Sequence, residues 1–120
     1  MTAHRIGFLL WPSTKPLTLA LAEEALSTAQ RVHPEVVYEV SFLQAEEPVD
    51  GAWRLPGSPW AGGLEGYRKL FLLADEPPAA VAPALAAALK QVARNGCCVG
   101  AVSAGVYPLA QLGLLDGYRA

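Results

Sequence analysis

A serine near the end of the chain is the residue that most resembles a catalytic nucleophile. Ser103 lies in a run of small side chains, residues 99–105, where an apolar stretch passes into a helical one. This is the shape of a nucleophile elbow, which raises a hydroxyl above the edge of a sheet beside backbone N–H groups. Gly100, Ala104 and Gly105 would form the small surroundings of such an elbow. The strict Gly-x-Ser-x-Gly spacing fails, because alanine replaces its first glycine, and similar turns occur without chemistry.

The two histidines are badly placed to activate this serine, which needs a base to accept its proton. His4 precedes the first predicted strand, and His33 follows the helix that returns beside that strand. Both therefore belong at the edge of the sheet opposite Ser103, one strand length or about 20 Å away. We predict that the chain has no catalytic residue and that Ser103 forms only a pseudo-nucleophile elbow.

The remaining reactive side chains indicate neither a metal site nor a cofactor. Cys97 and Cys98 are neighbours, and a disulfide between adjacent residues needs strained geometry, so we expect free thiols in a reducing cytoplasm. There is no Cys-x-x-Cys spacing, and two histidines are too few for the usual ligand sets.

Composition narrows the class of protein. The 120 residues suffice for one domain or part of one, and 52% of them are hydrophobic, which predicts a packed core. No apolar run reaches the roughly 18 residues of a membrane span, so no membrane association is expected. With a net charge of −2 and nine basic residues spread evenly, we expect no DNA binding by this piece alone.

Short apolar runs alternate with helical ones. Strands are predicted at residues 5–11, 36–44, 69–74 and 97–102, and helices at 17–32, 83–95 and 104–112. Residues 46–56 have the pattern of a hairpin, 57–66 that of a loop, and 114–120 that of a return toward another strand. The buried face of the first helix is predicted to carry Thr18, Leu21, Ala22, Ala25, Leu26, Ala29 and Val32.

This alternation predicts an α/β fold with a parallel sheet and helices on both faces, and it places ligand sites at the carboxyl ends of the strands. Because few strands precede residue 120, we expect a sheet that is incomplete at its C-terminus.

Several segments resemble a known family. Residues 8–12 (Phe-Leu-Leu-Trp-Pro), residues 100–110 (Gly-Ala-Val-Ser-Ala-Gly-Val-Tyr-Pro-Leu-Ala) and residues 113–120 (Gly-Leu-Leu-Asp-Gly-Tyr-Arg-Ala) are similar to the amino-terminal domain of GlxA-type AraC/XylS transcription regulators. Within this family, the sequence most resembles that of the arginine-responsive regulators of pseudomonads. The resemblance covers the whole chain. It implies a three-layer, flavodoxin-like domain of the DJ/PfpI, class I glutamine amidotransferase-like superfamily, with a helix-turn-helix domain expected downstream.

The chain departs from the catalytic pattern of that superfamily at three places. The family's enzymes have a cysteine at the elbow, where this chain has Ser103. They have an acidic residue early in the first helix, where Thr18 matches, and a Gly-Gly pair after the third core strand, where residues 73–76 read Leu-Ala-Asp-Glu. A carboxylate beside a developing oxyanion would be repulsive. The resemblance therefore implies that the pocket persists without its chemistry.

Three classes of function remain open. The first is a non-catalytic, effector-sensing and dimerisation domain of a cytoplasmic regulator, which would bind DNA only through the downstream domain and respond to an effector such as arginine. The second is a serine hydrolase or amidase that uses Ser103. The third is a free-standing module that binds a small molecule. For a cationic effector, carboxylates would come from Asp75, Glu76 or Glu24, and Thr18 and Ser103 would add hydrogen bonds.

Overall fold

The chain forms a twisted parallel sheet. The structure is a computed structural model that describes residues 3–48 and 54–114. Its strands are β1 (Ala3–Leu10), β2 (Val37–Gln44), β3 (Ser58–Pro59), β4 (Lys69–Ala74) and β5 (Cys98–Ser103). They pair in the order β3-β2-β1-β4-β5, and every pairing is parallel. The predicted α/β fold is thus confirmed, and β1 occupies the centre with β2 and β4 on either side.

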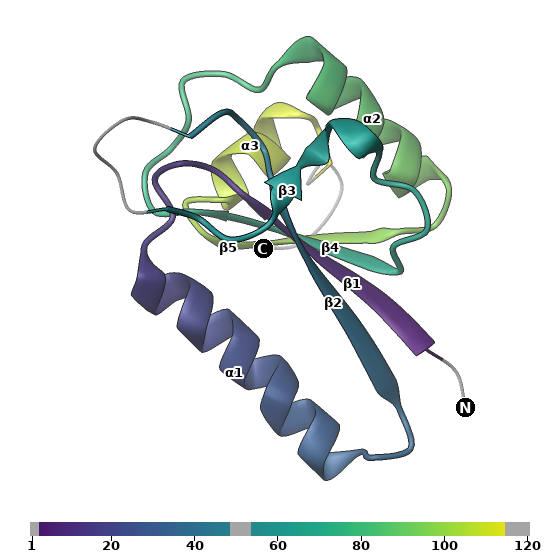
Figure 1. Cartoon of the computed structure of the whole chain (residues 1–120). Helices are drawn as coiled ribbons and strands as arrows, with labels where there is room; N and C mark the ends of the chain where they lie inside the picture. The colour runs from purple at the N-terminus through teal and green to yellow at the C-terminus, as the bar shows by residue number, and fades with distance from the viewer. Residues whose placement is uncertain (1–2, 49–53, 115–120) are drawn as a thin grey trace.

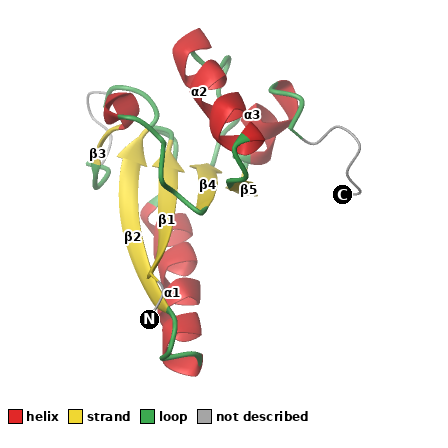
Figure 2. Cartoon of the chain, turned by 90° about the vertical axis from the view of Figure 1, so that its right-hand side faces the viewer, coloured by secondary structure: helices red, strands yellow, loops and turns green. Residues whose placement is uncertain are grey.

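The helices lie on both faces of the sheet, as predicted. Helix α1 (Pro16–Val32) covers one face, and α2 (Pro83–Arg94) and α3 (Val106–Gln111) cover the other (Figures 1 and 2). A short 3-10 turn, η1 (Trp60–Gly62), follows β3. Both long helices begin at a proline, a residue that suits the first turn because its missing N–H would be unpaired there anyway.

Two hydrophobic clusters hold the layers together, one on each face. Side chains alternate along a strand, so neighbouring residues of β1 enter different clusters. Beneath α1, the buried residues are Phe8, Leu10, Leu19, Leu55 and Leu73. Beneath α2 and α3, the larger cluster includes Leu9, Trp11, Leu70, Leu72, Leu85, Leu89 and Leu109. The central strands are therefore covered on both faces, as their continuous apolar sequences predict.

The predicted boundaries agree with the structure to within about two residues, apart from the segment between β2 and β4. That segment was expected to contain a hairpin over residues 46–56 and a loop over 57–66. The structure instead pairs Ser58 and Pro59 with Leu43 and Gln44 as a two-residue parallel strand. The middle of the expected hairpin, residues 49–53, and the expected return at residues 115–120 lie outside the described residues.

The predicted buried face of α1 is partly wrong. Leu21 and Val32 are about two-thirds exposed, and the buried residue is Leu19, with Ala22 and Leu26 partly buried beside it. The helix is rotated because the polar Gln30 faces the sheet. Its side-chain amide donates to the carbonyl of Val36 and accepts from the N–H of Tyr38, 3.1 Å away. These bonds to the β2 segment hold that face of the helix against the sheet.

Candidate functional site

The loops that follow β1 and β4 are bound to each other at the carboxyl edge of the sheet. The N–H of Trp11 donates to the carbonyl of Leu73 at 3.0 Å. The buried Thr14 hydroxyl donates to the same carbonyl at 2.8 Å. The direction in which successive strands are added to the sheet reverses here, because β2 lies on one side of β1 and β4 on the other. In open parallel sheets, this switch point is where ligands bind.

The hydroxyl oxygen of Ser13 accepts hydrogen bonds from two backbone N–H groups at this edge. The N–H groups of Asp75 and Glu76 both donate to Ser13 Oγ at 3.1 Å, and the hydroxyl donates in turn to the Glu76 carbonyl at 3.2 Å. Two adjacent N–H groups that point at one position can stabilise an oxyanion. Here a side chain of the same chain fills that position, so these donors are not free for a reacting group.

Asp75 caps the first helix. Its carboxylate accepts the N–H of Lys15 at 2.7 Å and the hydroxyl of Thr18 at 2.8 Å, one on each oxygen. Lys15 is the N-cap residue of α1, where no side chain of its own serves as the cap and where the first turn holds no acidic residue. The Asp75 carboxylate, from the loop after β4, therefore pairs with an N–H that has no acceptor within the helix. It also places negative charge at the positive end of the helix dipole.

Ser103 has the backbone of an elbow. Its φ of +54° makes it the non-glycine residue with positive φ among the described residues, a conformation that costs energy for any side chain. The N–H of Ala104 donates to the Ala74 carbonyl at 2.8 Å, which fixes the turn beside the end of β4. Gly105 is needed because a Cβ there would collide with the Leu72 carbonyl. The expected elbow is thus present in its backbone.

Neither histidine approaches Ser103. His4 lies near the start of β1, where the centroids of its ring and the Tyr38 ring are 6.0 Å apart. His33 is the C-cap residue of α1. Leu73, which pairs with Leu10, lies one residue before the partner of Ser103. Ser103 is therefore level with the end of β1, about 20 Å along the strand direction from His4. No imidazole among the described residues can accept the serine proton.

Among the described residues, the thiols and the acidic groups form no cluster suited to a metal ion. Cys97 and Cys98 are free thiols, half-buried and exposed respectively. Burial, with the neighbouring Cys98 as a smaller cause, raises the pKa of Cys97 and so disfavours its thiolate. Within residues 3–48 and 54–114, no cluster of three or more His, Cys, Asp or Glu side chains is suited to hold a metal ion.

Over the same described residues, none of the helices has the length and apolar character that crossing a bilayer requires.

The comparisons with known proteins point to regulators. The chain is 66% identical, over its whole length, to the HTH-type transcriptional regulator ArgR of Pseudomonas aeruginosa. It is 37% identical to the HTH-type transcriptional regulator CdhR of the same species over 94% of the chain, and 31% identical to an uncharacterised Streptomyces lividans protein, of which it covers 89%. The chain and the S. lividans protein belong to one family, and ArgR and CdhR each contain a segment similar to this chain. The chain spans 37% and 34% of the lengths of those two regulators.

Solved structures agree on the fold. An AraC family transcriptional regulator from Pseudomonas putida matches with a TM-score of 0.77 at 21% identity, and a putative regulator from Vibrio parahaemolyticus matches with 0.77 at 17%. Each match covers 96% of this chain and 64% of the solved chain. No family model matches the chain. At these identities, the likeness to the solved structures shows a shared fold and nothing finer.

The predicted site residues divide into those that the structure brings together and those that it does not. Thr18 and Asp75 meet directly, and Glu76 follows Asp75 in the same loop. Ser103 pairs with Ala74 in the neighbouring strand. Glu24, by contrast, is six residues beyond Thr18, about 9 Å along the helix.

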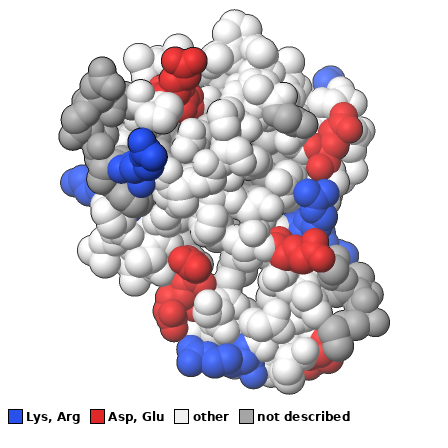
Figure 3. Space-filling view, in the orientation of Figure 1, with Lys and Arg blue, Asp and Glu red and all other residues white. Residues whose placement is uncertain are grey.

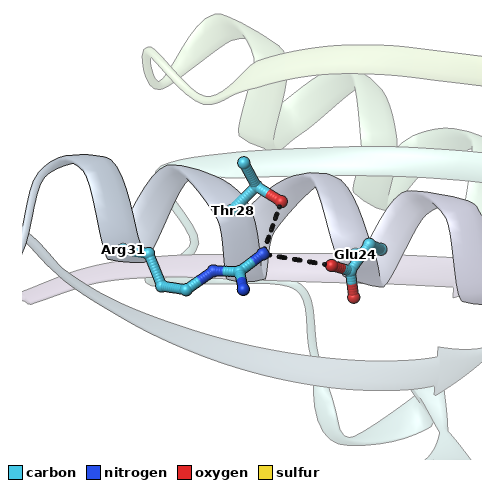
Figure 4. Close-up of polar contacts among 3 residues, drawn as sticks. All are labelled: Glu24, Thr28 and Arg31. Carbon is cyan, nitrogen blue, oxygen red and sulfur yellow. Dashed lines mark hydrogen bonds and ion pairs between the residues drawn. The ribbon is translucent and has the colours of Figure 1, made fainter.

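The carboxylate of Glu24 is engaged elsewhere. It forms an exposed ion pair with Arg31 at 3.3 Å, and the same guanidinium nitrogen also contacts the Thr28 hydroxyl at 3.2 Å (Figure 4). The structure therefore does not bring Glu24 to the carboxyl edge where the other predicted residues lie.

Sequence reasoning missed Ser13, Trp11 and Glu46. Ser13 and Asp75 are 62 residues apart, and no local pattern predicts their contact. Trp11 and Glu46 line a cavity of about 440 Å³ at the same edge. A signal was available in the topology, because Trp11 directly follows β1, Glu46 lies two residues after β2, and the carboxyl ends of these paired strands lie side by side.

Proposed function

We propose that this chain is the non-catalytic, effector-sensing and dimerisation domain of a cytoplasmic transcription regulator of the ArgR type. We further propose that it is a DJ/PfpI-like domain, that the regulator controls arginine or amino-acid metabolism, and that its effector is a small molecule such as arginine. The observation that carries the proposal is the 66% identity to ArgR over the whole chain. Identity at that level favours a shared role as well as a shared fold.

The site geometry supports a domain without catalysis. Acyl-transfer chemistry needs a base beside the nucleophile and free donors for the oxyanion. Here both histidines lie at the far edge, and Ser13 Oγ accepts the N–H groups of Asp75 and Glu76. The carboxylate of Asp75 is engaged in capping α1. Each of these groups has a structural role in place of a catalytic one.

The surface supports DNA binding through another part of the regulator. Basic and acidic side chains are interspersed on the face shown in Figure 3, with no continuous basic stripe. With a net charge of −2, the chain has little to gain from the release of counterions by DNA. Exposed apolar side chains on α1 and α3 favour self-association, and those that are large are Leu17, Leu21, Val32, Val106 and Tyr107.

Selection of DNA by the natural full-length protein tests this proposal. We expect specific duplexes to be enriched from fragmented genomic DNA at physiological salt, L-arginine to change their affinity, and the protein to sediment as a homodimer. Residues 1–120 alone should enrich nothing. A full-length protein that enriches no sequence would overturn the regulator role. Enrichment that ignores L-arginine and the other amino acids would overturn effector sensing alone.

One observation favours a second candidate, a hydrolase or amidase that uses Ser103. Its positive φ is the strained conformation of a nucleophile elbow. A fluorophosphonate probe distinguishes the two, because it labels only activated serines. The regulator proposal predicts no labelling of Ser103 in the full-length protein, with Ser103→Ala as the matched blank. Stoichiometric labelling that disappears in this variant would favour the enzyme.

A further inference from the structure

The outer edge of β2 is open along part of its length. The short β3 pairs only with Leu43 and Gln44, at the carboxyl end of β2, so no described strand lies beside residues 37–42 on that side (Figure 2). An unpaired strand edge offers backbone N–H and C=O groups to another chain, and folded proteins normally protect such edges. The pattern of free groups along this edge indicates which strand can pair with it.

Both ends of the open stretch are protected by the chain itself. The side-chain amide of Gln30 accepts the N–H of Tyr38 at 3.1 Å and donates to the carbonyl of Val36. Backbone groups alternate in direction along a strand, so the even-numbered residues of β2 face outward and the odd-numbered ones face β1. At the other end, Gly57 covers the outward carbonyl of Phe42 so closely that a Cβ on the glycine would collide with this oxygen.

The backbone groups between these two ends have no partner among the described residues. They are the carbonyl of Tyr38, the N–H and the carbonyl of Val40, and the N–H of Phe42. Read along the strand, they alternate between acceptor and donor and are centred on Val40. The open stretch is therefore short and has a defined order of groups.

This order is complementary to itself. When a second copy of β2 runs antiparallel about a two-fold axis at Val40, the N–H of each Val40 donates to the carbonyl of the other. The N–H of each Phe42 then donates to the carbonyl of Tyr38 in the other copy. The groups at these positions that would stay outside the pairing are the N–H of Tyr38 and the carbonyl of Phe42, which the chain already covers. Every free group of the stretch is thus paired.

The side chains beside this edge fit the same arrangement. Tyr38, Val40 and Phe42 lie on the α1 face of the sheet and line a hollow of about 400 Å³ between α1 and β2. Val40 is 38% exposed, which is high for a valine in a strand. The two-fold places Val40 opposite its own copy and Tyr38 opposite Phe42, and β-branched and aromatic pairs stabilise antiparallel strands. On the other face, Glu39 lies opposite Ser41 and not opposite a second carboxylate.

We infer that two copies of this chain associate through the open edge of β2, by antiparallel pairing about Val40 into one continuous sheet. The inference rests on the proposed dimerisation and assigns a surface to it. A two-fold pairing closes on itself, so it gives a dimer and leaves no open β2 edge to which a third copy could add.

Opposite charges at residue 40 test the pairing in the natural full-length protein. Sedimentation velocity should show a homodimer for the wild type at micromolar concentration. Val40→Lys and Val40→Asp should each raise the dissociation constant at least about tenfold, because like charges would lie directly opposite each other. An equal mixture of the two variants should associate to within about threefold of the wild type, since opposite charges then meet. Val32→Lys, which changes an exposed valine on α1, is the matched control and should stay a dimer.

A cysteine at the same position tests the pairing without charge, and it decides if a charged variant does not fold. In a Cys97→Ser, Cys98→Ser background, Val40→Cys should form a disulfide between two copies when diamide takes up the two thiol hydrogens. Residues opposite each other in a hydrogen-bonded antiparallel pair have Cα atoms about 5.5 Å apart, which suits a disulfide. Val32→Cys in the same background should cross-link far more slowly.

The other outcomes overturn the inference. If both charged variants remain dimers, if they stay apart when mixed, or if Val32→Lys alone dissociates the protein, residue 40 does not meet its copy, and dimerisation stands with another surface. A wild type that sediments as a monomer would overturn dimerisation and this surface together. The DNA selection described above tests the regulator role separately. Circular dichroism checks that each variant is folded.

Discussion

At the scale of single residues, Ser13 has the most contacts at this edge, because its hydroxyl bonds to the backbone of both Asp75 and Glu76. The donors of an oxyanion hole must be open to an oxygen of the substrate, whereas in this structure Ser13 Oγ accepts the N–H groups of residues 75 and 76. The same bonds hold the loop after β4 against the loop after β1. A single hydroxyl thus accounts for both the order of this edge and the loss of the donors that chemistry would need.

Replacing this hydroxyl should destabilise the domain. In Ser13→Ala, two backbone donors lose their acceptor, and we expect the free energy of unfolding to fall by about 1–2 kcal/mol. Chemical denaturation, followed through the unfolding transition of this domain, measures the change. Ser27→Ala, on the exposed surface of α1, is the control and should change the free energy by less than about 0.5 kcal/mol. Equal effects of the two substitutions would show that the Ser13 bonds contribute nothing.

Cys97 allows a prediction about pH. Burial raises its pKa, so the folded state favours the neutral thiol. The stabilisation is complete below the ordinary thiol pKa and is lost as the pH rises through the higher pKa of the folded state. At pH 8, iodoacetamide should therefore modify Cys97 in a Cys98→Ser variant several-fold more slowly than Cys98 in a Cys97→Ser variant. Mass spectrometry of timed samples gives both rates, and a faster reaction at Cys97 would contradict the effect of burial.

At the scale of elements, the most important contact is the cap of α1, because the carboxylate of Asp75 joins this helix to the loop after β4. Removing it in Asp75→Ala should lower the free energy of unfolding by about 1–2 kcal/mol, which is typical of a lost helix cap. Glu76→Ala, at the next position but without a side-chain partner in the described structure, should have a much smaller effect. Combining Asp75→Ala with Thr18→Val measures the coupling, for which we expect about 0.5–2 kcal/mol. Additive effects would mean that the 2.8 Å contact between these side chains is not energetically significant.

The elements also show how far the sequence predicts this protein. Apolar runs and prolines predicted the four long strands and three helices, because those signals are local. The rotation of α1 was missed, since it depends on hydrogen bonds between Gln30 and the β2 segment, and a polar residue facing a sheet contradicts the apolar pattern. The two-residue β3 is too short to have a periodic signal.

The candidate site was predictable only in part, for a similar reason. The edge of the sheet and the turn at Ser103 follow from the order of strands and small residues. The partners of Asp75 do not, because Lys15 and Thr18 are nearly 60 residues away in the sequence and meet it only in the folded chain. Asp75, which was predicted to bind a ligand from its position, caps α1 in the structure, and its binding of a ligand stays a prediction.

The two ends of the sheet differ at the scale of the whole molecule. The carboxyl edge gathers Ser103, the capped start of α1 and the cavity beside Trp11, whereas the histidines lie at the amino edge. Such a division suits a domain that binds a ligand without transforming it. In a regulator, ligand binding at this edge would be transmitted to DNA through differences in affinity between conformations.

The central claim is that this domain senses an effector without catalysis, and the response of DNA binding to L-arginine in Ser103→Ala tests it most directly. Fluorescence anisotropy of the full-length protein on an enriched duplex, with and without L-arginine, gives the response of the wild type and of the variant. We predict that the ratio of the two affinities in Ser103→Ala stays within about threefold of the wild-type ratio, the effect of losing at most one hydrogen bond. A folded variant that binds DNA but no longer responds to L-arginine, or a wild type that never responds, would contradict the claim.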